Sequence, residues 1–217
     1  MCNLYRMTKT VAEVANLFTG LGGAIEVSAG NFASEVYPGY PGLVFARRAG
    51  AGGAKGLALR SMVWGFPLVL TGKNGQPLKP RPINNARADK LDGFMWRYSF
   101  QERRCLIPVT SFAEAEGEKG AKTRTWISLP SSGPDPELFA IAGLWRDTPE
   151  WGPAYTMVMT EACLHVADVH DRMPVILKRA DWRDWLDGAP DQAGLLCRPY
   201  PELMVKERTA ESWVRRA

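Results

Sequence analysis

Short apolar segments separated by turn residues constrain the fold of this chain more than any other feature of its sequence. The 217 residues include 21 glycines and 16 prolines, and many of these lie in turn signals such as Tyr37-Pro38-Gly39 and Asn74-Gly75. Short apolar segments bounded in this way are typical of β-strands joined by hairpins. The pattern therefore predicts a single α+β domain over residues 1–217, rich in antiparallel hairpins and without an internal repeat. The predicted strands cover residues 43–47, 57–64, 103–109, 123–129, 139–145, 155–160 and 204–208.

Short helices are expected between these strands. The first begins with a Thr-x-x-Glu capping box at residues 10–13 and continues with apolar residues at helical spacing as far as Phe18. Trp182, Trp185 and Leu186 also have helical spacing, so they predict a helix that packs its aromatic side chains into the core. Two further helices are expected near residues 92–98 and 161–167.

Composition and charge exclude several classes of protein. The chain is 46% hydrophobic and 23% charged, and its apolar runs fall well short of the ~20 residues of a membrane span. Its start lacks the basic-then-apolar order of a secretory signal, so we expect a cytoplasmic protein without a membrane partner. Four cysteines without a C-x-x-C spacing argue against disulfides and against a structural zinc site. The glycine-rich residues 49–56 lack the spacing of a phosphate-binding loop, so a flexible hairpin is expected there. A net charge of +4 is compatible with a polyanionic partner. The C-terminal residues 209–217 are expected to be mobile.

The first two residues offer an unusual chemistry. Removal of Met1 would leave an α-amine and a thiol on the same residue, Cys2. Such a pair attacks an aldehyde first through nitrogen, giving a Schiff base, and sulfur then closes a five-membered thiazolidine ring. Reference pKa values of about 7.7–8.0 for the amine and about 8.5 for the thiol mean that a modest shift makes both nucleophilic at neutral pH. A cysteine at position 2 is weak evidence by itself, because chain termini usually fray.

Four separated segments of the chain match the motifs of one protein family and occur in the same order as in that family. They are Met1-Cys2, Asn-Ala-Arg-Ala-Asp at residues 85–89, residues 104–114, and His-Asp-Arg-Met-Pro-Val-Ile-Leu at residues 170–177. In this order they resemble the SRAP family, the SOS response-associated peptidases or abasic-site processing proteins. Residues 142–145 and Trp64-Gly65 fit the resemblance as well, which spans nearly the whole chain. The resemblance implies antiparallel sheets that form a barrel-like core flanked by short helices.

The resemblance also implies a function. Proteins of this family capture abasic sites in single-stranded DNA through a thiazolidine between the N-terminal cysteine and the ring-opened sugar, which protects the lesion during the DNA damage response. This chain is therefore expected to be a thiol-dependent enzyme and a monomer, associated with the nucleoid when bound to DNA, with no metal or other cofactor. The family name suggests that the protein removes Met1 itself, although a methionine aminopeptidase would also do so because Cys2 is small.

Residue roles follow from the same resemblance. A carboxylate near the terminus can shuttle the proton that is needed when the carbinolamine loses water, which suits Glu114. An imidazole that titrates near neutrality can open the closed sugar, which suits His170, and an uncharged amide can orient the amine or a sugar hydroxyl, which suits Asn85. The expected catalytic residues are Cys2, Asn85, Glu114 and His170, and the expected DNA-binding residues are Arg87, Arg172 and Trp64.

Each assignment has a purely structural alternative. His170 is one of two histidines and could be a surface or core side chain, while Glu114 could belong to a solvated acidic turn. Arg87 and Arg172 could pair with neighbouring aspartates instead of phosphates. For aromatic residues such as Trp64, core packing competes with stacking on unpaired bases.

This chain departs from the family pattern in two places. Asn3-Leu4 replaces the common Gly-Arg after the cysteine, and alanines flank Glu114 where the family usually has aromatic residues. These changes put DNA affinity in doubt more than the chemistry. The rival functions are an N-terminal-nucleophile amidohydrolase, in which the thiol of Cys2 attacks an amide, and a non-covalent DNA-binding module. Zinc binding through Cys163, His165 and His170 is a remote alternative, because their spacing fits no common site.

Overall fold

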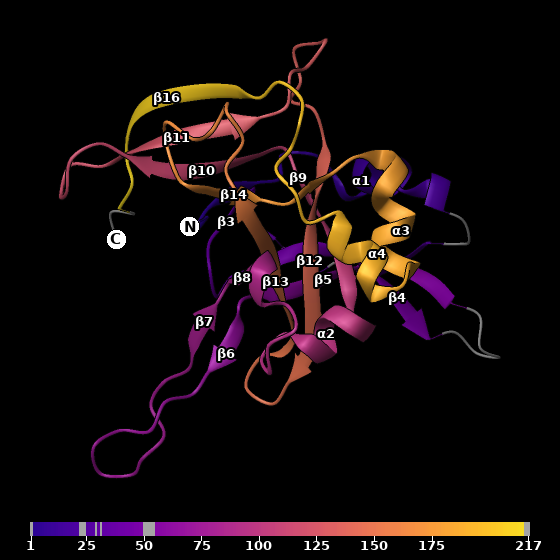
Figure 1. Cartoon of the computed structure of the whole chain (residues 1–217), viewed down its shortest axis with the longest axis vertical. Helices are drawn as coiled ribbons and strands as arrows, with labels where there is room; N and C mark the ends of the chain where they lie inside the picture. Colours follow the sequence, from indigo (N-terminus) through magenta and orange to yellow (C-terminus); the bar gives the residue numbers. More distant parts are fainter. Residues whose placement is uncertain (1, 22–24, 29, 31, 50–54, 215–217) are drawn as a thin grey trace.

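The computed structural model describes residues 2–21, 25–28, 30, 32–49 and 55–214. Within these residues, most strands belong to two sheets that lie across one another (Figure 1). The smaller sheet runs in spatial order through β16 (Val205–Ser212), β11 (Thr123–Ser128), β10 (Ser111–Glu116), β1 (Tyr5–Arg6) and β3 (Glu35–Val36). The larger sheet runs through β14 (Arg172–Pro174), β13 (Gly152–Glu161), β12 (Phe139–Thr148), β9 (Arg104–Val109), β4 (Pro41–Ala49), β5 (Lys55–Trp64) and β2 (Ile25–Ser28).

The larger sheet curls back on itself. A parallel pairing between β13 and β5, at Ala154↔Val63 and Tyr155↔Trp64, joins β13, β12, β9, β4 and β5 into a ring. Two short strands extend this sheet: β15 (Ile176–Leu177) pairs with β12, and β8 (Asn85–Arg87) pairs in parallel with β13. The ring confirms the expected α+β fold with a barrel-like core. The parallel pairings are an addition to the antiparallel hairpins that the sequence predicts.

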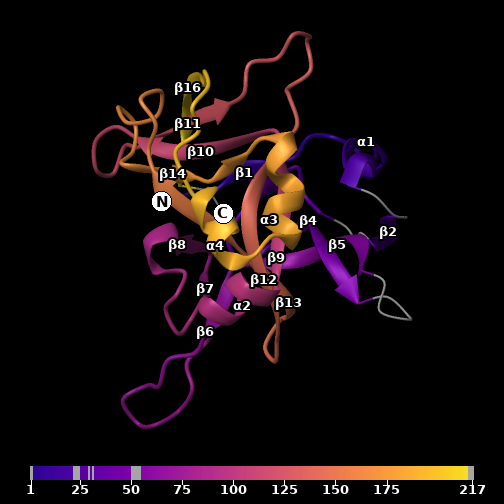
Figure 2. The same ribbon diagram turned by 45° about the vertical axis from the view of Figure 1, so that its right-hand side comes forward.

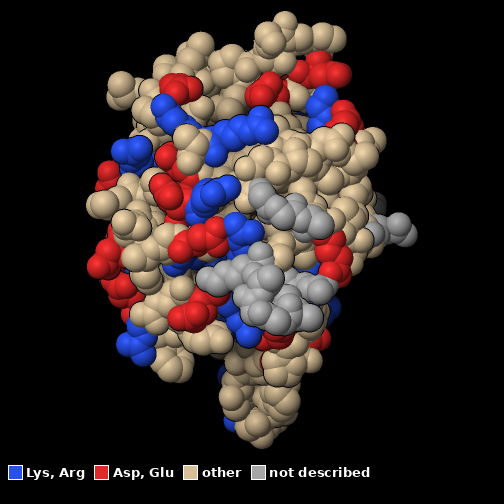
Figure 3. All heavy atoms as spheres, turned by 90° about the vertical axis from the view of Figure 1, so that its right-hand side faces the viewer, with Lys and Arg blue, Asp and Glu red and all other residues tan. Residues whose placement is uncertain are grey.

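Short helices pack around the ring. Figures 1 and 2 show α3 and α4 next to one another, and the hairpin of β6 (Phe66–Leu68) and β7 (Arg81–Ile83) projects away from the rest of the chain. On the face that carries α1 and α3, lysines and arginines are interleaved with acidic residues (Figure 3). No helix among the described residues is long and apolar enough to cross a membrane. The helical segments are α1 (Val11–Leu17), η1 (Thr19–Leu21), η3 (Ala88–Lys90), α2 (Arg97–Glu102), η4 (Arg179–Asp181), α3 (Trp182–Asp187) and α4 (Pro190–Leu195).

The core fills the ring and continues under the helices. Phe18, just after α1, stacks between Phe45 of β4 and Trp182 of α3, with ring centroids 3.9 and 4.3 Å away. Trp185 is fully buried and donates its Nε1 hydrogen to the carbonyl oxygen of Cys105 at 2.9 Å. The aromatic stripe of α3 therefore faces the core, as its spacing predicts.

A buried tyrosine pair lies between the two sheets. The hydroxyls of Tyr5 and Tyr155 are 2.5 Å apart, and both side chains are fully buried. Gly42 of β4 leaves the space for this pair, because a Cβ atom there would lie 2.0 Å from the hydroxyl oxygen of Tyr5 and 2.3 Å from that of Tyr155. The contact joins β1, which leads from Cys2, to the ring.

Several predicted boundaries need correction. The capping box is present, with the Thr10 N–H donating to Glu13 at 2.8 Å. The helix expected at 161–167 is absent, because β13 continues to Glu161 and turns follow it. The helix expected at 92–98 is displaced to α2, and residues 209–212 belong to β16 rather than to a mobile tail. Part of the predicted hairpin loop, 50–54, and residues 215–217 lie outside the described residues.

Candidate active site

The main chain after Cys2 is fixed against β10. The N–H of Ala113 donates to the carbonyl oxygen of Leu4 at 2.9 Å, and Tyr5 then pairs with Phe112. The Cys2 side chain is fully buried, and its thiol donates to the carbonyl oxygen of Leu4 at 3.5 Å. Burial, followed by the negative charge of Glu114, raises the pKa of the Cys2 thiol well above its usual range. The thiol is therefore protonated at neutral pH, which corrects the expectation that a modest shift would ionise it.

Two adjacent asparagines hold the carbonyl oxygen of Cys2. The side-chain Nδ2 of Asn84 donates to this oxygen at 2.9 Å and that of Asn85 at 2.8 Å. Asn84 also donates to Oδ1 of Asn3 at 2.9 Å. Asn85 is buried, and its Oδ1 has no hydrogen-bond partner among the described residues. We call Asn84 and Asn85 the amide clamp; Asn85 is among the expected catalytic residues, whereas Asn84 is not.

The amide clamp is itself held by the ring. The carbonyl oxygen of Asn84 accepts hydrogen bonds from Nε1 of Trp64 and from the N–H of Met157, both at 3.0 Å. Trp64 is fully buried, with its ring against Tyr5 and Tyr155. The expected contact of Trp64 with DNA is therefore wrong for this structure, because the indole has no exposed surface. Its hydrogen bond instead holds the main chain of Asn84 in place.

Glu114 lies on β10, next to the segment that carries Cys2. It pairs with Thr125 of β11 and is 2% exposed. The pKa of Glu114 is raised to about 7, mainly by burial and to a smaller extent by the negative charge of Asp171. A carboxyl group with this pKa exists in both protonation states at neutral pH, so it can donate or accept a proton. The solvated acidic turn that was the structural alternative does not describe this side chain.

His170 immediately precedes β14. Its Nδ1 accepts a hydrogen bond from the N–H of Arg172 at 3.0 Å and lies 2.8 Å from Oδ1 of Asp171. One nitrogen cannot accept from Arg172 and donate to Asp171 at the same time, so the two contacts belong to different protonation states. Burial lowers the pKa of His170, and the carboxylate of Asp171 opposes that shift. The neutral ring, with Nδ1 accepting from Arg172, is therefore the form that we assign at neutral pH.

Electrostatic coupling connects these elements. Asp171, next to His170, contributes to the raised pKa of Glu114 and to the raised pKa of Arg87, in which the hydrogen bond from Arg87 to Asp89 is the larger cause. Figures 1 and 2 both place the start of the chain beside β14 and close to β8. The structure thus gathers Cys2, the amide clamp, Glu114 and the 170–171 turn in one region.

Both predicted phosphate-binding arginines line one cavity. Arg87 of β8 and Arg172 of β14 border a cavity of about 480 Å³, which Arg198 and Glu161 also border. Arg87 makes a bidentate ion pair with Asp89, at 2.9 and 2.6 Å, with 45% of its side chain exposed. An exposed pair of this kind contributes little to stability, so Arg87 can exchange Asp89 for a phosphate at small cost.

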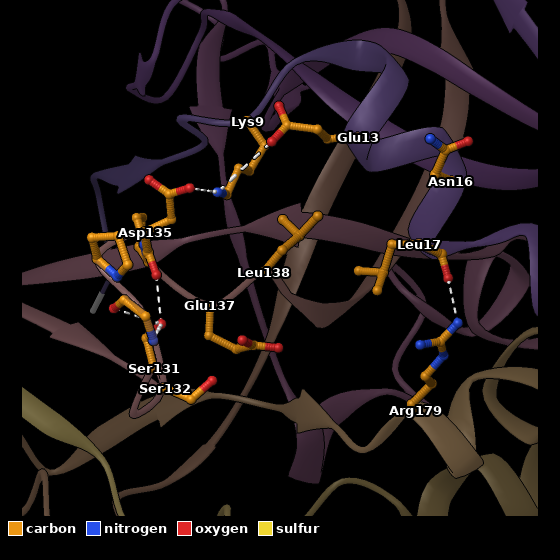
Figure 4. Close-up of a pocket in the computed structure, with 13 residues that line it drawn as sticks. Lys9, Glu13, Asn16, Leu17, Ser131, Ser132, Asp135, Glu137, Leu138 and Arg179 are labelled. Carbon is orange, nitrogen blue, oxygen red and sulfur yellow. Dashed lines mark hydrogen bonds and ion pairs between the residues drawn. The ribbon is translucent and has the colours of Figure 1, made fainter.

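A second cavity adjoins the amide clamp. It has a volume of about 400 Å³ and is lined by Asn3, Leu4, Tyr37, Pro38, Asn84 and Trp213. A third and larger cavity, of about 570 Å³, lies beside α1 and contains none of the predicted site residues. Figure 4 shows Lys9 in that larger cavity between Glu13 and Asp135, to which it is 3.8 and 3.3 Å away. Size alone therefore does not identify the active site in this fold.

Metal binding finds no support in the geometry. Among the described residues, no three or more histidine, cysteine, aspartate or glutamate side chains are grouped as metal ligands. The four cysteines are free thiols, and Cys2, Cys105 and Cys163 are buried. The remote alternative of zinc binding through Cys163, His165 and His170 gains nothing from their arrangement.

Comparison with protein families gives a match over almost the full chain. The family described as SOS response associated peptidase (SRAP) matches residues 1–216. Two curated relatives come from Bacillus subtilis: abasic site processing protein YoqW is 38% identical over 125 residues, and abasic site processing protein YoaM is 36% identical over 125 residues. The matched stretch covers 54% of this chain, 54% of YoqW and 53% of YoaM, so it spans about half the length of these relatives.

Solved structures confirm the fold. A protein from Bordetella bronchiseptica superposes with a TM-score of 0.73 at 22% identity, covering 96% of this chain and 99% of that chain. A protein from Bacteroides thetaiotaomicron gives a TM-score of 0.70 at 20% identity, covering 95% of this chain and 91% of that chain. At these identities the likeness concerns the fold alone.

Proposed function

Because the chain belongs to the SOS response associated peptidase (SRAP) family, we propose that it captures abasic sites in single-stranded DNA through a covalent thiazolidine on Cys2. The observation that carries this proposal is the arrangement around Cys2. The amide clamp fixes the carbonyl oxygen of this residue, and a carboxyl group with a pKa of about 7 lies within electrostatic reach of its thiol. The names of the Bacillus subtilis relatives, abasic site processing proteins, support the same substrate.

The reaction needs Met1 to be removed, since only then does Cys2 carry a free amine. This amine attacks the C1′ aldehyde of the ring-opened sugar and gives a carbinolamine. The carbinolamine loses one water to give an imine, and the sulfur of Cys2 adds to the same carbon. The thiol proton leaves sulfur and the imine nitrogen gains a proton, so aldehyde, amine and thiol give one thiazolidine and one water.

Glu114 supplies both proton transfers. In its protonated form it donates to the hydroxyl group that leaves as water, and as a carboxylate it then accepts the thiol proton of Cys2. Removal of the thiol proton is the step that most needs a base, because burial keeps this thiol protonated. A pKa of about 7 for Glu114 lets one carboxyl group serve in both directions at neutral pH.

His170 acts before the covalent steps. The abasic sugar is mostly a closed ring, and its aldehyde appears only when a proton moves between the ring oxygen and water. A neutral imidazole that accepts from Arg172 at Nδ1 carries its hydrogen on Nε2, where it can be delivered to the ring oxygen. Asn85 orients the amine or a sugar hydroxyl through its buried Oδ1, and Arg87 and Arg172 hold the flanking phosphates.

The chain's own chemistry also bears on the removal of Met1. We propose that the same thiol and carboxyl group allow the protein to remove Met1 itself, as the family description suggests. A methionine aminopeptidase would produce the same terminus. Purification of the wild type and of Glu114→Gln from a host whose aminopeptidase is inhibited, followed by intact mass analysis, separates the two routes: self-removal predicts that only the variant retains Met1.

Covalent capture is tested with an oligonucleotide that carries one abasic site. The wild type, with Met1 removed, is expected to form an adduct that survives denaturing electrophoresis, whereas Cys2→Ala is expected to form none. Cys163→Ala, which removes a different thiol that lines none of the cavities described above, is the matched control and should behave as the wild type. If Cys2→Ala binds DNA as well as the wild type and neither forms an adduct, the non-covalent module is the better account; turnover of a small amide without DNA would instead favour the amidohydrolase.

A further inference from the structure

The cavity beside the amide clamp combines aromatic walls with amide groups. Tyr37 and Trp213 supply the aromatic rings, Leu4 and Pro38 the remaining apolar surface, and Asn3 and Asn84 the amides. Asn84 also hydrogen-bonds to the carbonyl oxygen of Cys2, so one wall of the cavity contacts the residue that carries the reactive thiol. We propose that this cavity binds the nucleobase of the nucleotide next to the abasic sugar, an inference that rests on the proposed function.

The aromatic walls are held in place before any ligand arrives. The Tyr37 hydroxyl donates to Oε2 of Glu35 at 3.0 Å and accepts from Nη2 of Arg124 at 3.2 Å. The main-chain N–H of Trp213 donates to the carbonyl oxygen of Lys122 at 2.9 Å. Both rings pack against a small apolar cluster of Leu4, Ala113 and Trp126 that is separate from the main core. Anchored aromatic faces of this kind stack on bases of any sequence.

The amides offer groups for the edge of a base. The Nδ2 of Asn84 uses its two hydrogens on the carbonyl oxygen of Cys2 and on Oδ1 of Asn3. This arrangement leaves Oδ1 of Asn84 as an acceptor and Nδ2 of Asn3 as a donor. A donor and an acceptor beside stacking surfaces are the features by which proteins recognise a planar heterocycle.

Leu4 makes one wall of the cavity apolar. The common family opening has an arginine at this position, whereas this chain has a leucine that is 1% exposed and forms part of the apolar cluster. A cationic contact depends on salt, because it releases counterions from the DNA, whereas stacking and burial of a base do not. The cavity should therefore bind its ligand with an affinity that is almost independent of salt.

The test compares oligonucleotides that differ in one base. Each carries a reactive abasic site, and the neighbouring nucleotide on the 5′ side, on the 3′ side, or on neither side is replaced by tetrahydrofuran, which has no base and cannot react. Crosslinking rates are measured below saturation for the wild type, Trp213→Ala and Trp213→Phe. Trp151→Ala is the matched control, because Trp151 is a partly exposed tryptophan in the turn between β12 and β13.

The wild type is expected to lose rate about tenfold when the base is missing on one particular side, because a base–aromatic stack is lost. Trp213→Ala should show a similar loss on the intact oligonucleotide, at low and high salt alike, and no further loss when that base is missing. Trp213→Phe should restore most of the rate, and Trp151→Ala should match the wild type. Equal wild-type rates on all three oligonucleotides, or an unchanged dependence on the missing base in Trp213→Ala, would overturn the nucleobase site while leaving covalent capture intact. Absence of any adduct with the wild type would instead overturn the proposed function.

Discussion

Asn85 donates its side-chain amide to the carbonyl oxygen of Cys2 at 2.8 Å, although the two residues are 83 positions apart in the sequence. The other end of the same amide, Oδ1, is buried without a hydrogen-bond partner among the described residues. A buried acceptor in this state costs free energy, so a structure retains it where something else supplies the donor. The amine that removal of Met1 creates on Cys2, or a hydroxyl of the abasic sugar, is such a donor.

Replacement of Asn85 should therefore slow capture without unfolding the protein. In Asn85→Ala, we expect the crosslinking rate to fall by about tenfold, since one hydrogen bond is worth about 0.5–1.5 kcal/mol. Thermal stability should change little, because the substitution removes an unsatisfied acceptor together with the bond to Cys2. Asn74→Ala, at an exposed asparagine in the loop between β6 and β7, is the control. A crosslinking rate in Asn85→Ala that equals the wild-type rate would contradict the role of the amide clamp.

The raised pKa of Glu114 predicts a pH dependence of stability. Its pKa of about 7 in the folded protein exceeds the value of 4.5 that is usual for glutamate, so the folded state binds more protons than the unfolded state between these pH values. The stabilisation by the protonated carboxyl group is complete below pH 4.5 and is lost as the pH rises through about 7. The free energy of unfolding of Glu114→Gln, relative to that of the wild type, should therefore increase by up to about 3 kcal/mol from pH 5 to pH 8. Denaturant unfolding at both pH values measures this gain, and a constant difference would show that Glu114 is ionised at both.

Substitution of His170 should affect only lesions that must be opened. His170→Ala is expected to lower the rate of crosslinking to a natural, ring-closed abasic site by about 10²-fold, within the range for general acid–base catalysis. An oligonucleotide whose lesion is an acyclic aldehyde needs no ring opening and should react with this variant at nearly the wild-type rate. His165→Ala is the control, because His165 is the other histidine of the chain. Equal losses on both lesions would mean that His170 acts in the covalent steps or only in the structure.

Arg87 and Arg172 should govern the response to salt. Each phosphate contact that is removed should reduce the slope of log affinity against log salt by about 0.7 for single-stranded DNA. Affinity is measured with Cys2→Ala and an unreactive tetrahydrofuran oligonucleotide, so that binding is separated from chemistry. Arg103→Gln is the control, since Arg103 is paired with Asp147 and borders none of the cavities described above. Slopes that are unchanged in Arg87→Gln and Arg172→Gln would place the DNA elsewhere.

Local sequence signals predicted much of the fold. The capping box at Thr10 and Glu13 depends on residues three positions apart, and the aromatic spacing of α3 depends on one helix turn, so both were readable from the sequence. The helix expected at residues 161–167 was wrong because pairing of β13 with β14, at Glu161↔Arg172, extends the strand to the first of these residues. Such pairing joins residues that no local pattern relates.

In the candidate site, too, local motifs were predictable whereas long-range pairing was not. The motifs that carry Cys2, Asn85, Glu114 and His170 could be recognised one by one, but their arrangement depends on β1–β10 and β8–β13 pairing. Asn84 escaped prediction because an asparagine doublet after prolines is typical of a turn, and only the fold reveals its bond to Cys2. Trp64 was assigned to DNA because aromatic residues suit base stacking, whereas closure of the ring at Tyr155↔Trp64 buries it.

The most direct test of the central claim is the mass of the product. Protein that lacks Met1 is mixed with a single-stranded oligonucleotide bearing one abasic site, and the adduct is digested and analysed by mass spectrometry. Covalent capture predicts a species equal to the sum of protein and DNA less one water, with the modification on the peptide that begins at Cys2. An adduct on any other residue, the same adduct in Cys2→Ala, or no adduct at all would contradict capture by Cys2.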